Sequence, residues 1–341
     1  MTSASGTPLR LAILGCGAIT RTRHLPAAVA NPGVRIVMLV DSHVERAEAL
    51  RRIHGLDAKT DREPGAVLGQ ADAVINALPN HLHTPVNCEL LAAGIHVLCE
   101  KPLAASVADA RLSCDAAERG KAVLAVAMPW RFQDGCRLLE RALQQGVLGR
   151  IESYEWEHGT AYEWPTASGF YFSKEQAGGG ILLDEGVHFL DCLLQWFGPV
   201  TSFLYEDDDW GGGIEANAVL QLEHDGPRGR VRGRLRLSRM YELKNRLLVR
   251  GEAGDAEILR NDRGMLVLHH ELAGKDVEMT LRPADKSPDA FDAVLENFCE
   301  SALGYHPPAV AGRDAVQTIE LIERCYTQRR RLPEPWFEPA P

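Results

Sequence analysis

The chain has 341 residues, of which 45% are hydrophobic, and this length can bury the cores of two ordinary globular domains. Its net charge of -10 repels a phosphate backbone, so we expect no nucleic acid among its partners. The sequence has no targeting signal and no apolar run near the roughly 18 residues of a membrane span, so we expect no membrane contact. The eight cysteines form no Cys-x-x-Cys pair, which favours a reducing, cytoplasmic location.

Short apolar runs alternate with stretches of helical period between residues 9 and 127. The runs are LRLAIL, VRIVMLV, ADAVINAL, IHVLC and KAVLAVA. Strands without polar alternation are buried on both faces, as in a parallel sheet that carries helices on each side. The pattern therefore predicts a doubly wound, Rossmann-type α/β domain over residues 1–127 and a second domain over residues 128–341.

A glycine-rich turn follows the first of these strands. Its sequence, GCGAIT, matches the start of a dinucleotide fingerprint, with Thr20 where a third glycine is usual. We predict that Gly15, Gly17, Ala18 and Ile19 approach a pyrophosphate at the amino end of the next helix. Glycine-rich turns also follow many strands for steric reasons, so this motif alone is weak.

Asp41 strengthens the prediction, because it ends the second strand about 20 residues beyond the glycines, where a carboxylate binds the adenosine ribose. Such a carboxylate repels a 2′-phosphate, which favours NAD over NADP, and Ser42 adjoins it in the expected cofactor site. Two alternatives stay open: Asp41 caps the helix that begins near His43, or Arg46 pairs with a phosphate.

Two further segments come at the same edge of the predicted sheet. In the loop PNHLHTP, we expect Pro79, Asn80 and His83 to contact the nicotinamide half of a dinucleotide; a metal is not expected, since no third ligand is near. The strand 95–99 then delivers Glu100 and Lys101 to the edge where open α/β sheets bind ligands. We place Glu100 in the cofactor site and take Lys101 as the first candidate for chemistry.

The second half carries runs of period two between residues 151 and 283, which predict one broad, mainly antiparallel open sheet. In RVRGRLRLS the arginines share one face, which is either solvated or an oligomer contact. Two helical patterns between residues 286 and 330 predict packing helices.

Within this half, GGGILLDEGVHFLD begins a helix with a polar stripe formed by Asp184, His188, Asp191 and Gln195. A solvated stripe is the plain alternative, but it has no Lys or Arg, and the glycines before it let a backbone or a ligand come close. A histidine one turn from each of two carboxylates suits proton transfer.

These motifs resemble, in order and over nearly the whole chain, the Gfo/Idh/MocA family (glucose-fructose oxidoreductase, inositol dehydrogenase and rhizopine catabolism). The matching segments are GCGAIT, Asp41, PNHLHTP, AGIHVLCEKP and GGGILLDEGVHFLD. The resemblance implies an NAD(P)-dependent enzyme that acts on a hydroxyl or carbonyl of a sugar, an inositol or a related polyol. It also implies that Asp184 and His188 contact the substrate hydroxyls together with Lys101, and that the open sheet assembles homo-oligomers, as dimers or tetramers.

The chemistry gives these three residues roles. His188 is the expected general base, because its ordinary pKa of ~6.5 lies nearest physiological pH. Lys101 would polarise the substrate oxygen, and it could take the proton itself if burial lowered its pKa. Asp184 would bind a neighbouring hydroxyl. The sequence leaves open which residue takes the proton.

Arg131 and Trp164 complete the expected substrate site. Arg131 either binds a carboxylate or phosphate of the substrate or forms a structural ion pair. Trp164 belongs to an aromatic group with Tyr154, Trp156 and Tyr162, which either floors a sugar pocket or packs in the core. The sequence thus favours an NAD-dependent dehydrogenase over an NADP-dependent keto-sugar reductase or a non-catalytic dinucleotide sensor on the same fold.

Overall fold

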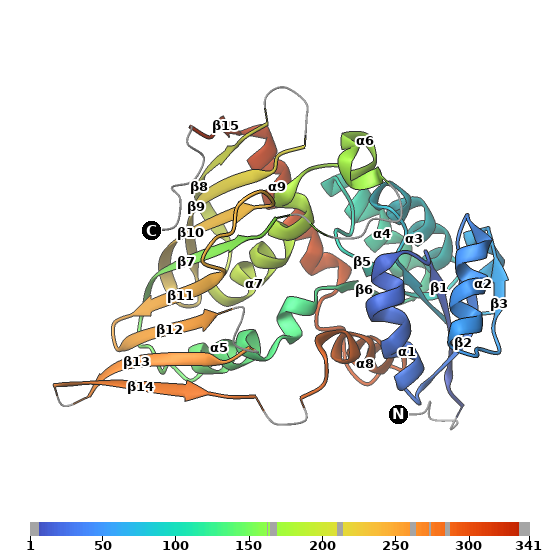
Figure 1. Ribbon diagram of the computed structural model, residues 1–341, viewed down its shortest axis with the longest axis horizontal. Coiled ribbons are helices and arrows are strands. Elements are labelled where there is room, and N and C mark those ends of the chain that lie inside the picture. Colours follow the sequence, from blue (N-terminus) through green and yellow to red (C-terminus); the bar gives the residue numbers. More distant parts are fainter. Residues whose placement is uncertain are drawn as a thin grey trace. The chain divides into compact units, whose positions relative to one another are not determined.

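The chain divides into two compact units, each assembled from segments that are distant in the sequence (Figure 1). The structure, a computed structural model, describes residues 7–161, 163, 169–209, 214–259, 264–272, 274–283 and 287–333. Unit 1 comprises Met1–Pro129, Pro165–Gly178 and Asp289–Glu320. Unit 2 comprises Trp130–Trp164, Gly179–Pro288 and Leu321–Pro341.

Unit 1 contains a parallel sheet with the strand order β3-β2-β1-β4-β5-β6 among its described residues. The strands are β1 (Leu9–Leu14), β2 (Val34–Val40), β3 (Lys59–Asp61), β4 (Ala73–Asn76), β5 (His96–Glu100) and β6 (Leu124–Ala127). The order reverses at β1, which pairs with both β2 and β4, and ligands of such sheets bind outside the carboxyl ends at this point. The predicted doubly wound fold is confirmed.

Helices pack against this sheet and against one another. They are α1 (Leu25–Ala30), α2 (Val44–Ile53), α3 (His83–Ala92), α4 (Val107–Gly120), α6 (Lys174–Ala177), α8 (Ala290–Ala302) and the first part of α9 (Gly312–Thr327). Although α8 comes late in the chain, it contacts α1 and β6. Short helical turns at Thr20–His24, Pro64–Val67, Asn80–Leu82 and Gly169–Phe172 complete the unit. The residues of β4 are all buried, as expected of a strand covered on both faces.

Unit 2 is built on a large sheet with the strand order β14-β13-β12-β11-β7-β10-β9-β8-β15. The strands are β7 (Ile151–Gly159), β8 (Val200–Asp207), β9 (Asn217–Gly226), β10 (Gly229–Ser238), β11 (Arg246–Gly251), β12 (Gly254–Leu259), β13 (Leu266–Leu272), β14 (Lys275–Leu281) and β15 (Arg330–Arg331). Among the described strands of this sheet, only the pairs β7–β10 and β8–β15 are parallel. The mainly antiparallel sheet is as predicted.

The two faces of this sheet differ in chemistry. On β10, Val231, Leu235 and Leu237 are fully buried, and on the other face Arg232 pairs with Glu223 at 2.7 Å. Gly233 lies on the apolar face and leaves room for the ring of Tyr154, with which a Cβ atom would overlap. Tyr154 in turn stacks on Phe197 of helix α7 (Val187–Phe197), with ring centroids 5.1 Å apart. The apolar face of the sheet therefore packs against α7.

Unit 2 also contains two helical elements outside its sheet. Helix α5 (Asp134–Gln144) contacts β12 and β13, and a π-helical turn, Leu182–Gly186, leads directly into α7. A short helical turn, Pro129–Phe132, begins at the boundary of the two units. Across the part of the chain that the structure describes, no helix has the length and apolar composition of a membrane span.

Candidate functional site

The glycine loop after β1 is fixed by its backbone and by Asp41. Gly15 has a φ of 86°, and a Cβ atom there would overlap the carbonyl oxygen of Ala77. Such a backbone conformation and such a close approach both require glycine. The next amide, Cys16 N, donates to Asp41 Oδ2 at 2.8 Å, so the loop is bound to the end of β2.

Asp41 is 6% exposed and has a second backbone contact, because its Oδ1 accepts a hydrogen bond from His43 N at 2.9 Å. Asp41 therefore binds the backbone between β2 and α2, but it does not cap α2, whose N-cap residue is His43 and has no side-chain cap hydrogen bond. Arg46 Nη1 lies 3.7 Å from Asp41 Oδ1, so this arginine faces the carboxylate.

Thr20 stands where a third glycine is usual, and it is completely buried. Its hydroxyl donates to the carbonyl oxygen of Gly15 at 2.5 Å. The threonine therefore joins the first residue of the loop to the start of the π-helical turn Thr20–His24.

Two of the residues predicted for the nicotinamide half contact the backbone of unit 1. His83 is completely buried, and its Nδ1 and Nε2 each lie 2.8 Å from a carbonyl oxygen, of Pro102 and Leu78 respectively. Burial lowers the pKa of His83, and the two carbonyl contacts oppose that shift. The Asn80 amide donates to the carbonyl oxygen of Ala177 at 2.8 Å. His83 therefore joins the loops after β4 and β5, and Asn80 holds the α6 segment.

Glu100 and Lys101 come at the carboxyl end of β5. The Glu100 carboxylate, 8% exposed, lies 2.6 Å from His24 Nε2 through Oε1, and its Oε2 accepts from Lys101 N at 3.1 Å. Burial alone raises the pKa of Glu100, but the His24 hydrogen bond and the Lys101 charge outweigh it, and the net pKa is lowered. Sequence reasoning missed His24, whose position in the first helical segment carries no signal of this contact.

In unit 2 the predicted polar stripe is buried at two of its four residues. His188 is 5% exposed and Asp191 is 1% exposed. Asp184 is half-buried, and Gln195 is exposed, with its amide donating to Glu140 at the surface. Asp184 lies in the π-helical turn Leu182–Gly186, so the regular α-helical spacing assumed for the whole stripe begins only at Val187.

Both carboxylates of this stripe are paired with arginines. Asp184 Oδ2 lies 3.2 Å from Arg239 Nη2. Asp191 accepts two hydrogen bonds from Arg131, at 2.5 Å from Nε and 2.8 Å from Nη2. Of the two roles that the sequence left open for Arg131, the structure shows the ion pair. Arg239, which directly follows β10, was missed, since no local motif marks it.

The aromatic group divides between the core and residues not described. Trp156 is 3% exposed, and its ring packs on Phe189 and Trp130 at centroid distances of 4.7 and 5.8 Å. Trp156 is thus a core residue. The predicted substrate residue Trp164, like Tyr162, lies outside the described residues.

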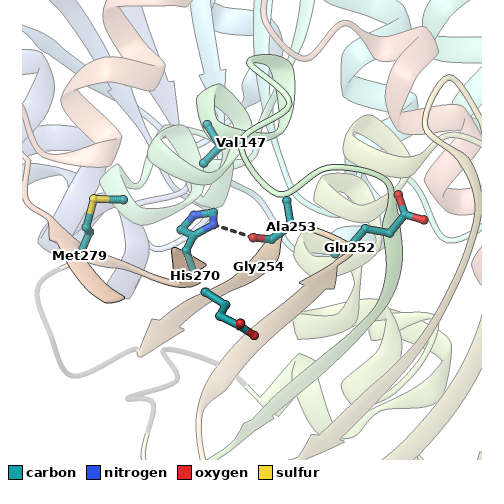
Figure 2. Close-up of a pocket in the computed structure, with 8 residues that line it drawn as sticks. Val147, Glu252, Ala253, Gly254, His270 and Met279 are labelled. Atoms are coloured by element: carbon teal, nitrogen blue, oxygen red, sulfur yellow. Dashed lines mark hydrogen bonds between the residues drawn. The ribbon is translucent and has the colours of Figure 1, made fainter. Parts of the chain in front are cut away.

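A cavity of about 660 Å³ opens beside the turn between β11 and β12 in unit 2 (Figure 2). Its lining residues are Val147, Gly251, Glu252, Ala253, Gly254, His270, Glu271 and Met279. Figure 2 shows His270 turned toward Ala253, whose carbonyl oxygen is 2.7 Å from Nδ1. This lining includes none of the predicted site residues. Among the described residues, no His, Cys, Asp and Glu side chains gather in a group of three that could hold a metal ion.

The fold defines a class of protein in which a Rossmann nucleotide-binding unit is combined with an open-sheet α+β unit. The residues at the carboxyl edge of the unit 1 sheet and those of the polar stripe in unit 2 agree with this class. Residues 9–128 match the model of an oxidoreductase family with an NAD-binding Rossmann fold, and residues 136–257 match the GFO/IDH/MocA C-terminal domain. The chain belongs to the Gfo/Idh/MocA oxidoreductase family, and the resemblance seen in the sequence is confirmed.

Individual relatives agree with this assignment. The chain is 32% identical to D-glucoside 3-dehydrogenase of Escherichia coli (strain K12) over 199 residues, 57% of this chain and 55% of that protein. It thus spans about half the length of that relative. It is 26% identical to 1,5-anhydro-D-fructose reductase of Ensifer adhaerens, over 91% of this chain and 93% of the other. A structure of levoglucosan dehydrogenase with NADH and levoglucosan shares the fold, with a TM-score of 0.85, 18% identity and coverage of 94% and 97%.

Proposed function

We propose that this protein is an NAD-dependent oxidoreductase that transfers a hydride between nicotinamide and a hydroxyl-bearing carbon of a sugar, an inositol or a sugar derivative. One observation in unit 1 carries the proposal: the glycine loop with Asp41 and the segment Glu100-Lys101 both follow the carboxyl ends of parallel strands. Nucleotide-binding sheets place their ligands at this edge. The names of the relatives, which act on sugars, support the substrate class.

The cofactor residues follow from the same edge. We propose that Gly15, Gly17, Ala18 and Ile19 bind the pyrophosphate, that Asp41 and Ser42 bind the adenosine ribose, and that Pro79, Asn80, Glu100 and Lys101 lie near the nicotinamide. His83 supports this arrangement through its two carbonyl contacts.

The preference for NAD rests on Asp41. Its buried carboxylate would oppose a 2′-phosphate by charge repulsion. Arg46, 3.7 Å from the same carboxylate, is the feature that favours the NADP-dependent alternative.

The chemistry needs a base and a cation at one substrate oxygen. NAD held by the glycine loop and Asp41 would supply the hydride acceptor for the carbinol carbon. In the proposed reaction, His188 takes the proton of the reacting hydroxyl, and the Lys101 ammonium stabilises the negative charge that develops on its oxygen. Asp184 binds a neighbouring hydroxyl, and its ion pair with Arg239, at 3.2 Å, holds the carboxylate in place. Arg131 acts indirectly, through its ion pair with Asp191, which lies on α7 together with His188. We keep Trp164 as a proposed substrate contact.

A cofactor and substrate screen tests the proposal. The protein is incubated with NAD or NADP and with D-glucose, methyl glucoside, levoglucosan, 1,5-anhydro-D-glucitol, myo-inositol or UDP-glucose, and reduced cofactor is followed at its near-ultraviolet absorbance. We expect turnover with NAD. Turnover with NADP alone would favour the reductase, and binding of NAD without turnover of any compound would favour the dinucleotide sensor.

Two further proposals concern the environment of the protein. The eight cysteines are all free, which supports a reducing, cytoplasmic compartment. We also propose that the protein forms a homo-oligomer, a dimer or a tetramer, through the ion-paired face of the unit 2 sheet. Light scattering of the purified protein at high and low salt measures this assembly.

A further inference from the structure

The π-helical turn Leu182–Gly186 and α7 together carry Asp184 and His188, and we call them the site helix. The glycines before the site helix make room for other parts of unit 2. A Cβ atom on Gly180 would overlap the backbone and the carboxylate of Glu215, and one on Gly179 would overlap the ring and hydroxyl of Tyr326. Close approach of another backbone, one of the two possibilities raised by the sequence, is therefore what the structure shows. Gly180 leaves room for Glu215, and Gly179 leaves room for Tyr326.

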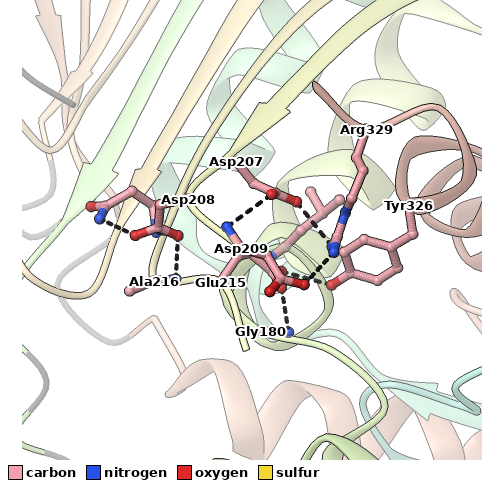
Figure 3. A network of polar contacts seen from close by, with 10 residues as sticks. Gly180, Asp207, Asp208, Asp209, Glu215, Ala216, Tyr326 and Arg329 are labelled. Carbon is pink, nitrogen blue, oxygen red and sulfur yellow. Dashed lines mark hydrogen bonds and ion pairs between the residues drawn. The ribbon is translucent and has the colours of Figure 1, made fainter. Parts of the chain in front are cut away.

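Glu215 accepts hydrogen bonds from three successive backbone amides, of which Figure 3 labels that of Gly180. Gly180 N donates to Oε2 at 3.0 Å, Ile181 N to the Glu215 carbonyl oxygen at 2.9 Å, and Leu182 N to Oε1 at 3.1 Å. Amides at the start of a helix have no acceptor within that helix. One residue, 35 positions away from Gly180, therefore supplies the acceptors for the beginning of this helical segment.

Glu215 itself is held by a polar network. The Tyr326 hydroxyl of α9 donates to Glu215 Oε1 at 2.7 Å. The guanidinium of Arg329 lies over the Tyr326 ring, 5.2 Å from its centroid, and pairs with Asp207 and Asp209, as Figure 3 shows. Glu215 is 2% exposed, so solvent does not compete for its contacts. These contacts therefore fix the position of the Glu215 side chain.

We propose that Glu215 is a positioning residue, which fixes the amino end of the helical segment that carries Asp184 and His188 and thereby places their side chains for reaction. This inference rests on the proposed function for its effect on turnover. Asp184 is within the fixed turn, because its amide donates to the carbonyl oxygen of Gly180 at 2.9 Å. A displacement of about 1 Å in a reacting group can cost about 10²-fold in rate.

The energetics of Glu215 favour a positioning role over simple packing. Burial raises the pKa of Glu215, and the hydrogen bonds from Tyr326 and Leu182 oppose that shift without cancelling it. A buried carboxylate is costly, and an apolar side chain of similar volume often stabilises a core as well or better. An apolar residue could not supply the oxygen atoms that accept hydrogen bonds from the amides of Gly180 and Leu182.

The test compares Glu215→Gln, Glu215→Ala and Tyr326→Phe with the wild type, and uses Glu223→Gln as the matched control. Glu223 is a β9 carboxylate that also holds two partners, Ser202 and Arg232, but at the surface. The measurements are hydrogen exchange at the amides of residues 180–184, thermal unfolding, NAD affinity, and kcat and KM with the best substrate of the screen.

We expect kcat per folded molecule to fall about 10²-fold in Glu215→Ala and less in Glu215→Gln, which keeps one carbonyl acceptor. NAD affinity should not change, and exchange at residues 180–182 should accelerate. A residue that only stabilises the fold would change the folded fraction but not kcat per folded molecule. Wild-type kcat and wild-type exchange in Glu215→Gln and Tyr326→Phe would overturn the inference, also if Glu215→Ala did not fold.

The outcome is separable from the proposed function. If the wild type turns over no compound of the screen, the proposed function fails, while the exchange at residues 180–182 still decides whether Glu215 holds the helix. Unchanged exchange in every Glu215 variant would then refute the inference on its own.

Discussion

The nucleotide loop of unit 1 and the site helix of unit 2 are held in different ways. The loop depends on backbone: Gly15 bends where only glycine fits, and Asp41 and His83 contact main-chain atoms at one edge of the sheet. The helix depends on charged side chains, because Arg239 and Arg131 pair with its carboxylates. Sheet topology thus builds one group of residues, and specific pairs between distant segments build the other.

The largest effects are expected at the two residues proposed to act on the reacting oxygen of the substrate. We expect Lys101→Ala and His188→Asn each to lower kcat by about 10²- to 10⁴-fold, because each removes a group that handles charge or a proton in the transition state. NAD affinity should remain measurable in Lys101→Ala, by calorimetry. If the two residues serve the same transition state, the losses in the double variant are not additive. Normal turnover in Lys101→Ala would refute its assignment.

The buried ion pair of the site helix gives the next effect. Arg131→Met leaves Asp191, 1% exposed, without this partner, and we expect a loss of about 3–5 kcal/mol in the free energy of unfolding. Urea titration measures it, and Arg131→Met/Asp191→Asn should recover a large part. Arg62→Met is the control, since both side chains of its pair with Glu45 in unit 1 are exposed, and its unfolding midpoint should not move. Equal losses in both variants would contradict the distinction between the two pairs.

Most of the fold was predictable because apolar runs report burial directly. The exceptions are short: β3 (Lys59–Asp61) is a polar edge strand of three residues, and β15 has only two, so neither carries a hydrophobic pattern. Helical period also predicted α8 but not its place on α1 and β6, since an apolar stripe shows that a helix packs without naming its partner.

The site divides along the same line. Motifs mark Lys101, Asp184 and His188 as candidates, whereas no motif marks Glu215 or Arg239. Their partners on the site helix lie 35 and 55 residues away in the chain, and no local spacing connects a glutamate before β9 with the amides of a distant helix. The run of glycines was the one available signal, because it indicated a close approach without naming the approaching residue.

The dependence of the nucleotide loop on backbone is tested by Gly15→Ala. Gly55→Ala is the matched control, because Gly55 has a φ of 60° but nothing within 4 Å of an added Cβ atom. We expect the control to lose about 1–2 kcal/mol in unfolding free energy from its left-handed backbone alone. Gly15→Ala should lose more, since its Cβ also meets Ala77, and it should weaken NAD binding. Equal losses with unchanged NAD affinity would show that the loop tolerates a side chain.

The smallest effect compares one buried histidine from each unit. His224 in unit 2 resembles His83 in unit 1: its ring nitrogens lie 2.8 Å from the Tyr154 hydroxyl and from the Gly198 carbonyl oxygen. Burial lowers the pKa of both histidines. In acid the unfolded chain therefore binds more protons than the folded chain, which shifts the equilibrium toward unfolding. Their stabilising effect is complete above the unfolded pKa of about 6.5 and declines as the pH falls toward the lowered folded values.

Urea unfolding is measured between pH 8 and pH 5, and the slope of the unfolding free energy against pH is compared between variants. This slope reports the contribution of each histidine to the acid response. We expect His83→Gln and His224→Gln each to reduce the acid slope, by at most about 1.4 kcal/mol per pH unit, the value for one proton. The slope is the informative quantity, because either substitution also removes hydrogen bonds and lowers stability at every pH. A wild-type slope in His83→Gln with a reduced slope in His224→Gln would mean that the two carbonyl contacts of His83 offset its burial. Of these two histidines, only His224 in unit 2 would then contribute to the acid response.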